Sequence, residues 1–128
     1  MREVLLVGVG GALGAMSRYG VSRAMIRLIG ESFPYGTLVV NCLGSLLIGL
    51  LMQTLLGSDL VPSSLRLALI VGFLGAFTTF SAFSYETVTY FKNGSWHLGA
   101  ANIAANVVLG IGFVLLGMAI ARYVFKVA

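Results

Sequence analysis

Four long apolar stretches dominate this sequence and leave one kind of fold open to it. They run approximately from Val4 to Ile29, from Thr37 to Leu56, from Ser63 to Phe91 and from Trp96 to Tyr123. Each contains the roughly 20 residues that a helix needs to cross a bilayer, where a helix satisfies its own backbone groups. The sequence therefore predicts an all-α membrane protein, with residues 1–128 forming a single domain of four transmembrane helices. The apolar run after Glu3 is expected to be the first span of the mature protein, since the rest of the chain is equally apolar.

Composition excludes several other classes of protein. Hydrophobic residues make up 59% of the chain and charged residues 9%. This leaves too few charged residues to cover a surface that faces water, so an ordinary soluble protein is excluded. The net charge is +4, but the basic residues are single and scattered, so no nucleic-acid partner is expected. One His, one Cys and four carboxylates cannot assemble a nucleophile, a base and an orienting group, so the chain is not expected to be an enzyme.

The third stretch is too long for a straight helix across a bilayer. From Ser64 to Phe91 it contains 28 residues, which would extend about 42 Å against a hydrocarbon thickness of about 30 Å. Its middle carries glycines followed by hydroxyl residues, in the segment Gly72-Phe73-Leu74-Gly75-Ala76-Phe77-Thr78-Thr79-Phe80-Ser81. Such a composition is typical of interrupted membrane helices. We therefore predict a break in this helix near Gly75 to Thr79.

The basic residues give no preferred orientation in the membrane. Four spans place both termini on one side, and that side carries Arg2, Arg66, Arg122 and Lys126. The opposite side carries Arg18, Arg23, Arg27 and Lys92. Because Lys and Arg in loops set orientation, an equal count predicts insertion in both directions and an antiparallel homodimer. Small-residue spacings at Gly10/Gly14 and Ser45/Gly49 favour close helix contacts.

Polar side chains recur along one face of the later stretches. They are Asn41, Ser45, Gly49 and Gln53 in the second, Thr78, Thr79, Ser81, Ser84 and Thr87 in the third, and Asn102, Asn106 and Gly110 in the fourth. They either join helices by hydrogen bonds or line a polar pathway. The only carboxylate inside a span is Glu86, whereas a cation route usually shows Asp or Glu within the spans and a proton relay shows carboxylates or histidines. Amides, hydroxyls and the ring edges of Phe80 and Phe83 favour a small anion. Arg18 either reaches an interface or pairs with an acceptor.

Three segments resemble the Fluc (CrcB) family of fluoride channels. They are Gly10-Gly11-Ala12-Leu13-Gly14-Ala15-Met16-Ser17-Arg18-Tyr19, Gly36-Thr37-Leu38-Val39-Val40-Asn41 and Gly72-Phe73-Leu74-Gly75-Ala76-Phe77-Thr78-Thr79-Phe80-Ser81-Ala82-Phe83-Ser84. The resemblance covers the whole chain, and the third segment is the most specific. It implies a multi-pass protein of the bacterial inner membrane that passes fluoride passively and lowers the cytoplasmic fluoride concentration.

The resemblance also implies roles for individual residues in an antiparallel, dual-topology homodimer. Pore residues would be Asn41, Phe80, Phe83, Ser81, Ser84 and Asn106, and Arg18 would have a structural role. A structural sodium ion, not transported, would be held at the dimer interface by the backbone carbonyls of Gly75 and Thr78. The chain departs from the family in the fourth span, where Gly110 and Val114 replace hydroxyl residues, and at Ala82.

Two rival interpretations stay open at this stage. A small multidrug exporter also has four short spans, but it would need a carboxylate in the first span, where the sequence has only terminal Glu3. The other rival is a non-conducting assembly subunit whose polar residues only join helices. The sequence assigns no role to Glu86.

Overall fold

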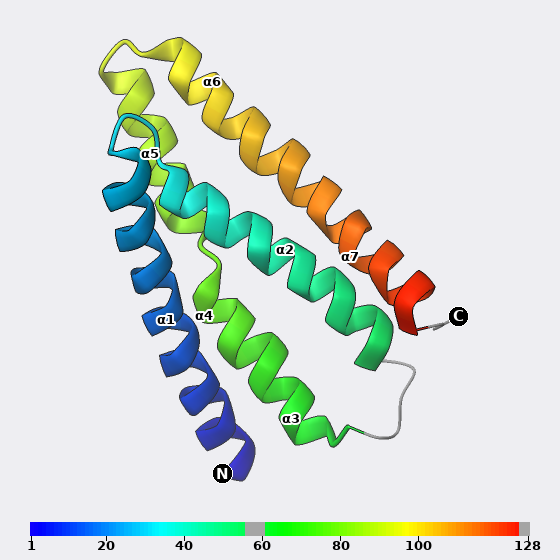
Figure 1. Cartoon of the computed structure of the whole chain (residues 1–128). Helices are drawn as coiled ribbons and strands as arrows, with labels where there is room; N and C mark the ends of the chain where they lie inside the picture. The colour runs from blue at the N-terminus through cyan, green and yellow to red at the C-terminus, as the bar shows by residue number, and fades with distance from the viewer. Residues whose placement is uncertain (56–60, 126–128) are drawn as a thin grey trace.

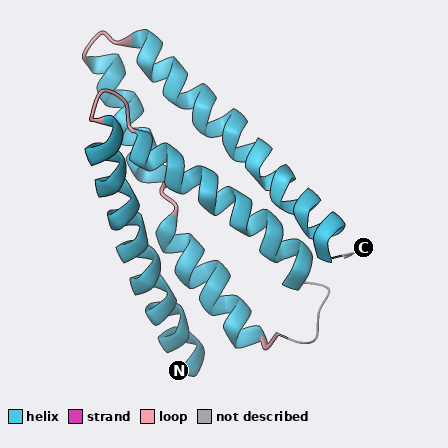
Figure 2. Cartoon of the chain, in the orientation of Figure 1, coloured by secondary structure: helices cyan, strands magenta, loops and turns pink. Residues whose placement is uncertain are grey.

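The computed structural model describes residues 1–55 and 61–125, which form four helical passes that alternate in direction (Figures 1 and 2). The first two passes are the helices α1 (Arg2–Ile29) and α2 (Tyr35–Leu55). The third consists of α3 (Ser63–Leu67), the π-helical segment η1 (Ala68–Leu74), α4 (Gly75–Phe77) and α5 (Phe80–Lys92). The fourth consists of α6 (Trp96–Ala104), the π-helical segment η2 (Ala105–Leu109) and α7 (Gly110–Phe125).

All four passes are long and apolar enough to cross a membrane, as the sequence predicts. The predicted end of the second span at Leu56 and the basic residue Lys126 lie outside the described residues. Between 6% and 22% of the most apolar window of each pass is buried inside the chain. So thin a core is unsuited to water, but it suits a helix bundle whose outer surface is solvated by lipid. The fold is that of a multi-pass membrane protein.

The passes pack in two close pairs, α1 against the first half of the third pass and α2 against α7 (Figure 1). Glycines allow both contacts. A methyl group at Gly10 would overlap the carbonyl oxygen of Ala68, and one at Gly14 would overlap that of Phe73. In the second pair, a methyl group at Gly49 would overlap the Val114 carbonyl. The predicted role of these glycines in close helix packing is confirmed.

Gly117 tests this packing most directly, since a methyl group there would overlap the Leu46 carbonyl of α2. We expect Gly117→Ala to lower the free energy of unfolding by roughly 1–3 kcal/mol, as overpacking against rigid backbone does. Gly112→Ala is the matched control, because Gly112 is an exposed residue of the same helix with nothing within 4 Å of the added methyl group. Thermal unfolding in detergent measures both variants. Equal midpoints would contradict the proposed contact.

The third pass changes direction locally between α4 and α5. Thr78 (φ −82°, ψ 160°) and Thr79 (φ −151°, ψ 112°) have extended backbone dihedrals, and they lie within the segment where the sequence predicts a break. The first half ends at Phe77, and Thr78 caps it by donating from both its amide and its hydroxyl to the Leu74 carbonyl, each at 3.1 Å. The Thr79 hydroxyl begins the second half by accepting from the Ala82 amide at 3.2 Å. The backbone carbonyls just before the interruption, those of Gly75 and Thr78 among them, thereby lose their usual helical donors.

Candidate functional site

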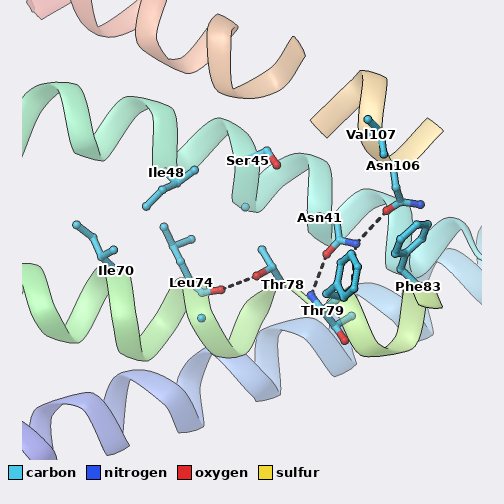
Figure 3. A pocket seen from close by; sticks show the side chains of 13 residues that line it. Asn41, Ser45, Ile48, Ile70, Leu74, Thr78, Thr79, Phe83, Asn106 and Val107 are labelled. Carbon is cyan, nitrogen blue, oxygen red and sulfur yellow. Dashed lines mark hydrogen bonds between the residues drawn. The ribbon is translucent and has the colours of Figure 1, made fainter. Parts of the chain in front are cut away.

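A cavity of about 450 Å³ lies where α2, the third pass and η2 meet (Figure 3). Its polar lining comes from Asn41 and Ser45 of α2, Thr78 and Thr79 between α4 and α5, and Asn106 of η2. The remaining wall is apolar and glycine-rich, and it includes Phe80 and Phe83 of α5. No lysine, arginine, histidine, aspartate or glutamate is among the described residues that line the cavity. The site therefore offers amide, hydroxyl and ring groups without a fixed charge.

The carboxamide of Asn41 holds the backbone of Thr79 from across the bundle (Figure 3). Its oxygen Oδ1 accepts from the Thr79 amide at 2.9 Å, and its nitrogen Nδ2 donates to the Thr79 carbonyl at 3.2 Å. Because Thr79 is extended, its amide and carbonyl make no helical hydrogen bonds. The two bonds from Asn41 supply the partners that these groups would otherwise lack. Asn41 therefore fixes the position of the interruption relative to α2.

A chain of side-chain hydrogen bonds extends from Asn41 into the fourth pass. Asn41 Nδ2 also donates to Asn106 Oδ1 at 2.9 Å, and Asn106 Nδ2 donates to Asn102 Oδ1 and to the Asn102 carbonyl, both at 3.0 Å. Asn102, which is fully buried, donates to the Thr87 hydroxyl at 3.0 Å. Thr87 in turn donates to the Phe83 carbonyl at 2.8 Å. This amide chain (Asn41, Asn106, Asn102) thus connects α2, the fourth pass and α5.

The two phenylalanines predicted to line the pathway lie against each other at the cavity. Their ring centroids are 5.4 Å apart and the ring planes are inclined by 59°. Phe83 is half-buried, whereas 78% of Phe80 is exposed on the surface of the chain. The hydrogen edges of such tilted rings carry a partial positive charge. These edges are the kind of group that attracts an anion without binding it as an ion pair.

The other predicted site residues divide between the cavity and its surroundings. Gly75 and Thr78 line the cavity, but Ser81 and Ser84 lie outside its wall. Ser81 shares a hydrogen bond of 3.3 Å with the Thr79 hydroxyl, and Ser84 donates to the Phe80 carbonyl of its own helix at 2.9 Å. Arg18 of α1 is half-buried and donates from Nη1 to the Thr78 carbonyl at 3.5 Å, so α1 also contacts the interruption.

Glu86 lies in a separate cavity of about 310 Å³ between the end of α1, the turn that follows it, the start of α2 and α5. Its Oε1 accepts from the Thr37 hydroxyl at 2.6 Å. Its Oε2 is buried and has no hydrogen-bond partner among the described residues. The carboxyl group therefore stands apart from the wall of the larger cavity, and it places no charge there.

The sequence places Asn102, Thr79 and Ser45 on the polar faces of their spans, but it assigns none of them a separate role. Ser45 lies four residues after Asn41 and Asn102 lies four residues before Asn106, spacings that put each pair on one helix face. Their hydrogen-bond partners could not be read from this spacing. The two π-helical segments also left no trace in the sequence, although π-helical turns often occur at functional sites.

Four apolar passes and an uncharged polar cavity define a small helical membrane protein with a site between its passes. A family model described as CrcB-like protein, Camphor Resistance (CrcB), matches residues 5–118. The chain belongs to the CrcB family, which confirms the resemblance found in the sequence.

Curated relatives of this chain carry the name fluoride-specific ion channel FluC. One from Dehalococcoides mccartyi is 56% identical over 117 residues, which cover 91% of this chain and 90% of the relative. One from Syntrophotalea carbinolica is 47% identical over 94% of this chain and 98% of its own length. One from Geotalea daltonii is 44% identical over 97% of this chain and all of its own length.

Proposed function

We propose that this chain is a fluoride-specific ion channel that passes fluoride passively across the bacterial inner membrane and so lowers cytoplasmic fluoride. The names of its relatives support this function. The observation that carries the proposal is the uncharged wall of the cavity, where amide, hydroxyl and ring groups gather without an ionised side chain. The chemistry required is ion transfer, which needs no catalytic group.

The wall suits fluoride for a physical reason. A small anion loses strong water contacts when it enters a narrow path, and polar donors must replace them. A lysine or arginine in the wall would bind the ion tightly and slow its release, whereas amides, hydroxyls and ring edges bind it weakly enough to let it leave. Asn41, Phe80 and Phe83 are the central groups of this path. Asn106 continues it toward the fourth pass, and Ser81 and Ser84 flank Phe80 and Phe83 along α5.

The proposed channel is an antiparallel, dual-topology homodimer. Phe80 is 78% exposed on a single copy, and Gly75 is also exposed, so one copy leaves both groups uncovered. A second copy would cover this surface and enclose the path. The balanced basic residues support insertion in both orientations. Reporter tags on each terminus test this arrangement, and finding every terminus on one side of the membrane would exclude it.

The interruption between α4 and α5 suits a structural sodium ion. The Thr79 amide, which would pair with the Gly75 carbonyl in an unbroken helix, is bound to Asn41 instead. The Thr78 carbonyl accepts only a long 3.5 Å bond from Arg18 among the described residues. Carbonyls of interrupted membrane helices are typical sodium ligands. Gly75 and Thr78 of each copy would hold the ion, which would stabilise the contact between copies by coordinating carbonyl oxygens that otherwise lack a partner.

Fluoride efflux from liposomes tests the proposed function. Purified protein is reconstituted in vesicles loaded with potassium fluoride, valinomycin is added to carry potassium, and an electrode records external fluoride. We expect rapid release of fluoride, and no chloride release from vesicles loaded with potassium chloride. Vesicles that hold correctly eluting protein and still retain fluoride would exclude a channel. They would favour a non-conducting subunit, and proton-driven export of an organic cation would favour a multidrug exporter.

Removal of sodium is expected to weaken the channel. If sodium is coordinated by the carbonyls of Gly75 and Thr78, dialysis into potassium or N-methylglucamine buffer leaves those oxygens without a partner in a poorly hydrated interface. We therefore expect slower fluoride efflux and a lower unfolding midpoint of the dimer in sodium-free buffer, with recovery when sodium is returned. Unchanged efflux and unchanged melting without sodium would contradict this site.

A further inference from the structure

Most donors around the larger cavity are already bound to protein acceptors. Both N–H hydrogens of Asn41 are in use, one on Thr79 and one on Asn106. The side-chain amide of Asn106 is directed to Asn102. The Thr78 hydroxyl donates to the Leu74 carbonyl, and the Thr79 hydroxyl is shared with Ser81. An anion can take one of these donors only if a bond within the protein is given up.

Ser45 is the exception in the wall. It lies one helical turn after Asn41 on α2, lines the cavity and is half-buried (Figure 3). Its hydroxyl makes no hydrogen bond to any described residue of the chain. A methyl group added at Gly110 of α7 would lie 3.6 Å from Ser45 Oγ, so the absence of a side chain at Gly110 leaves space beside the hydroxyl.

Other hydroxyl residues of these helices behave differently. Within a helix, serine and threonine commonly donate to the carbonyl four residues earlier. Four hydroxyls of this chain outside the cavity wall do so at 2.8–2.9 Å, namely those of Thr54, Ser84, Thr87 and Thr89. Ser45 does not, although the Asn41 carbonyl stands at the same relative position. The Ser45 hydroxyl is half-buried and borders the cavity, so a partner for it must come from the cavity itself.

We propose that the Ser45 hydroxyl is the resident hydrogen-bond donor to fluoride in this cavity. The inference rests on the proposed channel function and specifies which group of the wall can donate to the ion without giving up a bond within the protein. An O–H group donates strongly to an anion, and at Ser45 it can do so without breaking a bond of the protein. Asn41, by contrast, must release its 3.2 Å bond to the Thr79 carbonyl before it can donate. Ser45 therefore receives the ion, and Asn41 can bind it by exchanging partners.

The test compares two substitutions in α2 that each remove one hydroxyl. Ser45→Ala removes the free donor, and Thr54→Val removes a hydroxyl that is bound within its own helix and lies outside the cavity wall. Fluoride efflux is measured at several fluoride concentrations. We expect Ser45→Ala to slow efflux at low fluoride roughly tenfold and to raise the half-saturating concentration, since a hydrogen bond to a charged group is lost. Thr54→Val should conduct like the unchanged protein.

The outcomes separate this inference from the function on which it rests. If the unchanged protein releases no fluoride, the channel function fails. If the unchanged protein and Ser45→Ala conduct equally at every concentration, only the role of Ser45 is overturned. If Ser45→Ala elutes as an aggregate, Ser45→Cys replaces it, because a thiol of similar size is a weak donor and the same loss is expected.

Discussion

Replacement of Asn41 by alanine is expected to abolish most fluoride efflux and to destabilise the fold. The substitution removes the two bonds that hold Thr79 and the bond to Asn106. It leaves the Thr79 amide and the Asn106 Oδ1 without these partners. Each unsatisfied buried group costs about 1–3 kcal/mol, so the free energy of unfolding should fall by roughly 2–4 kcal/mol. Thermal unfolding in detergent and efflux from liposomes measure the two effects.

Asn93→Ala is the matched control for this experiment. Asn93 is exposed in the turn between α5 and α6, away from both cavities, and the same atoms are removed. It should melt and conduct like the unchanged protein. An Asn41→Ala variant with the melting midpoint and the efflux of this control would show that the interruption does not depend on the carboxamide.

The second large effect is expected at the phenylalanine pair. Phe80→Ile and Phe83→Ile each keep an apolar side chain but remove the positive ring edge that is proposed to attract the ion. A favourable ring contact is worth on the order of 1 kcal/mol, and 1.4 kcal/mol corresponds to a tenfold change. We therefore expect efflux to fall roughly tenfold for either variant and further for the double variant. Gel filtration should still show the assembled protein.

Phe91→Ile serves as the comparison for these variants. Phe91 lies on the same helix, packs against Trp96 with ring centroids 5.1 Å apart, and is not part of the cavity wall. Its substitution should leave efflux within about twofold, because the ring only fills space between α5 and α6. If all three variants lose efflux equally, the loss comes from packing, and the rings do not act on the ion.

Helix length and apolarity made most of the fold predictable. The predicted spans agree with the described passes to within a few residues, because an uninterrupted apolar stretch of this length is stable only across a bilayer. The sequence also predicts a break near Gly75 to Thr79, from glycines and threonines in the middle of an overlong stretch, and Thr78 and Thr79 have extended backbone there. The π-helical segments η1 and η2 could not be predicted, because they arise from contacts with other passes.

Several residues of the candidate site could be identified from the sequence, but the hydrogen bonds between them could not. The sequence identifies Asn41, Asn106, Phe80 and Phe83, and the structure brings all four to one cavity. It does not place Ser81 and Ser84 in that wall, although the family resemblance implied pore roles for both. Spacing in the sequence also does not reveal that Ser84 donates to its own helix, whereas Ser45 lines the cavity without such a bond.

By itself, the sequence determined that this chain has four stretches long and apolar enough to cross a membrane, and that the polar groups within them carry little charge. It also located the glycine- and threonine-rich segment in the middle of the third stretch. These are local properties, set by the length and composition of each stretch. Only the tertiary structure decided that Asn41 hydrogen-bonds to the backbone of Thr79, 38 residues away in the sequence, and that Asn102 connects the amide chain to Thr87. Hydrogen-bond partners across a bundle depend on how helices turn toward one another, and that rotation is settled by glycine contacts such as Gly14 on Phe73.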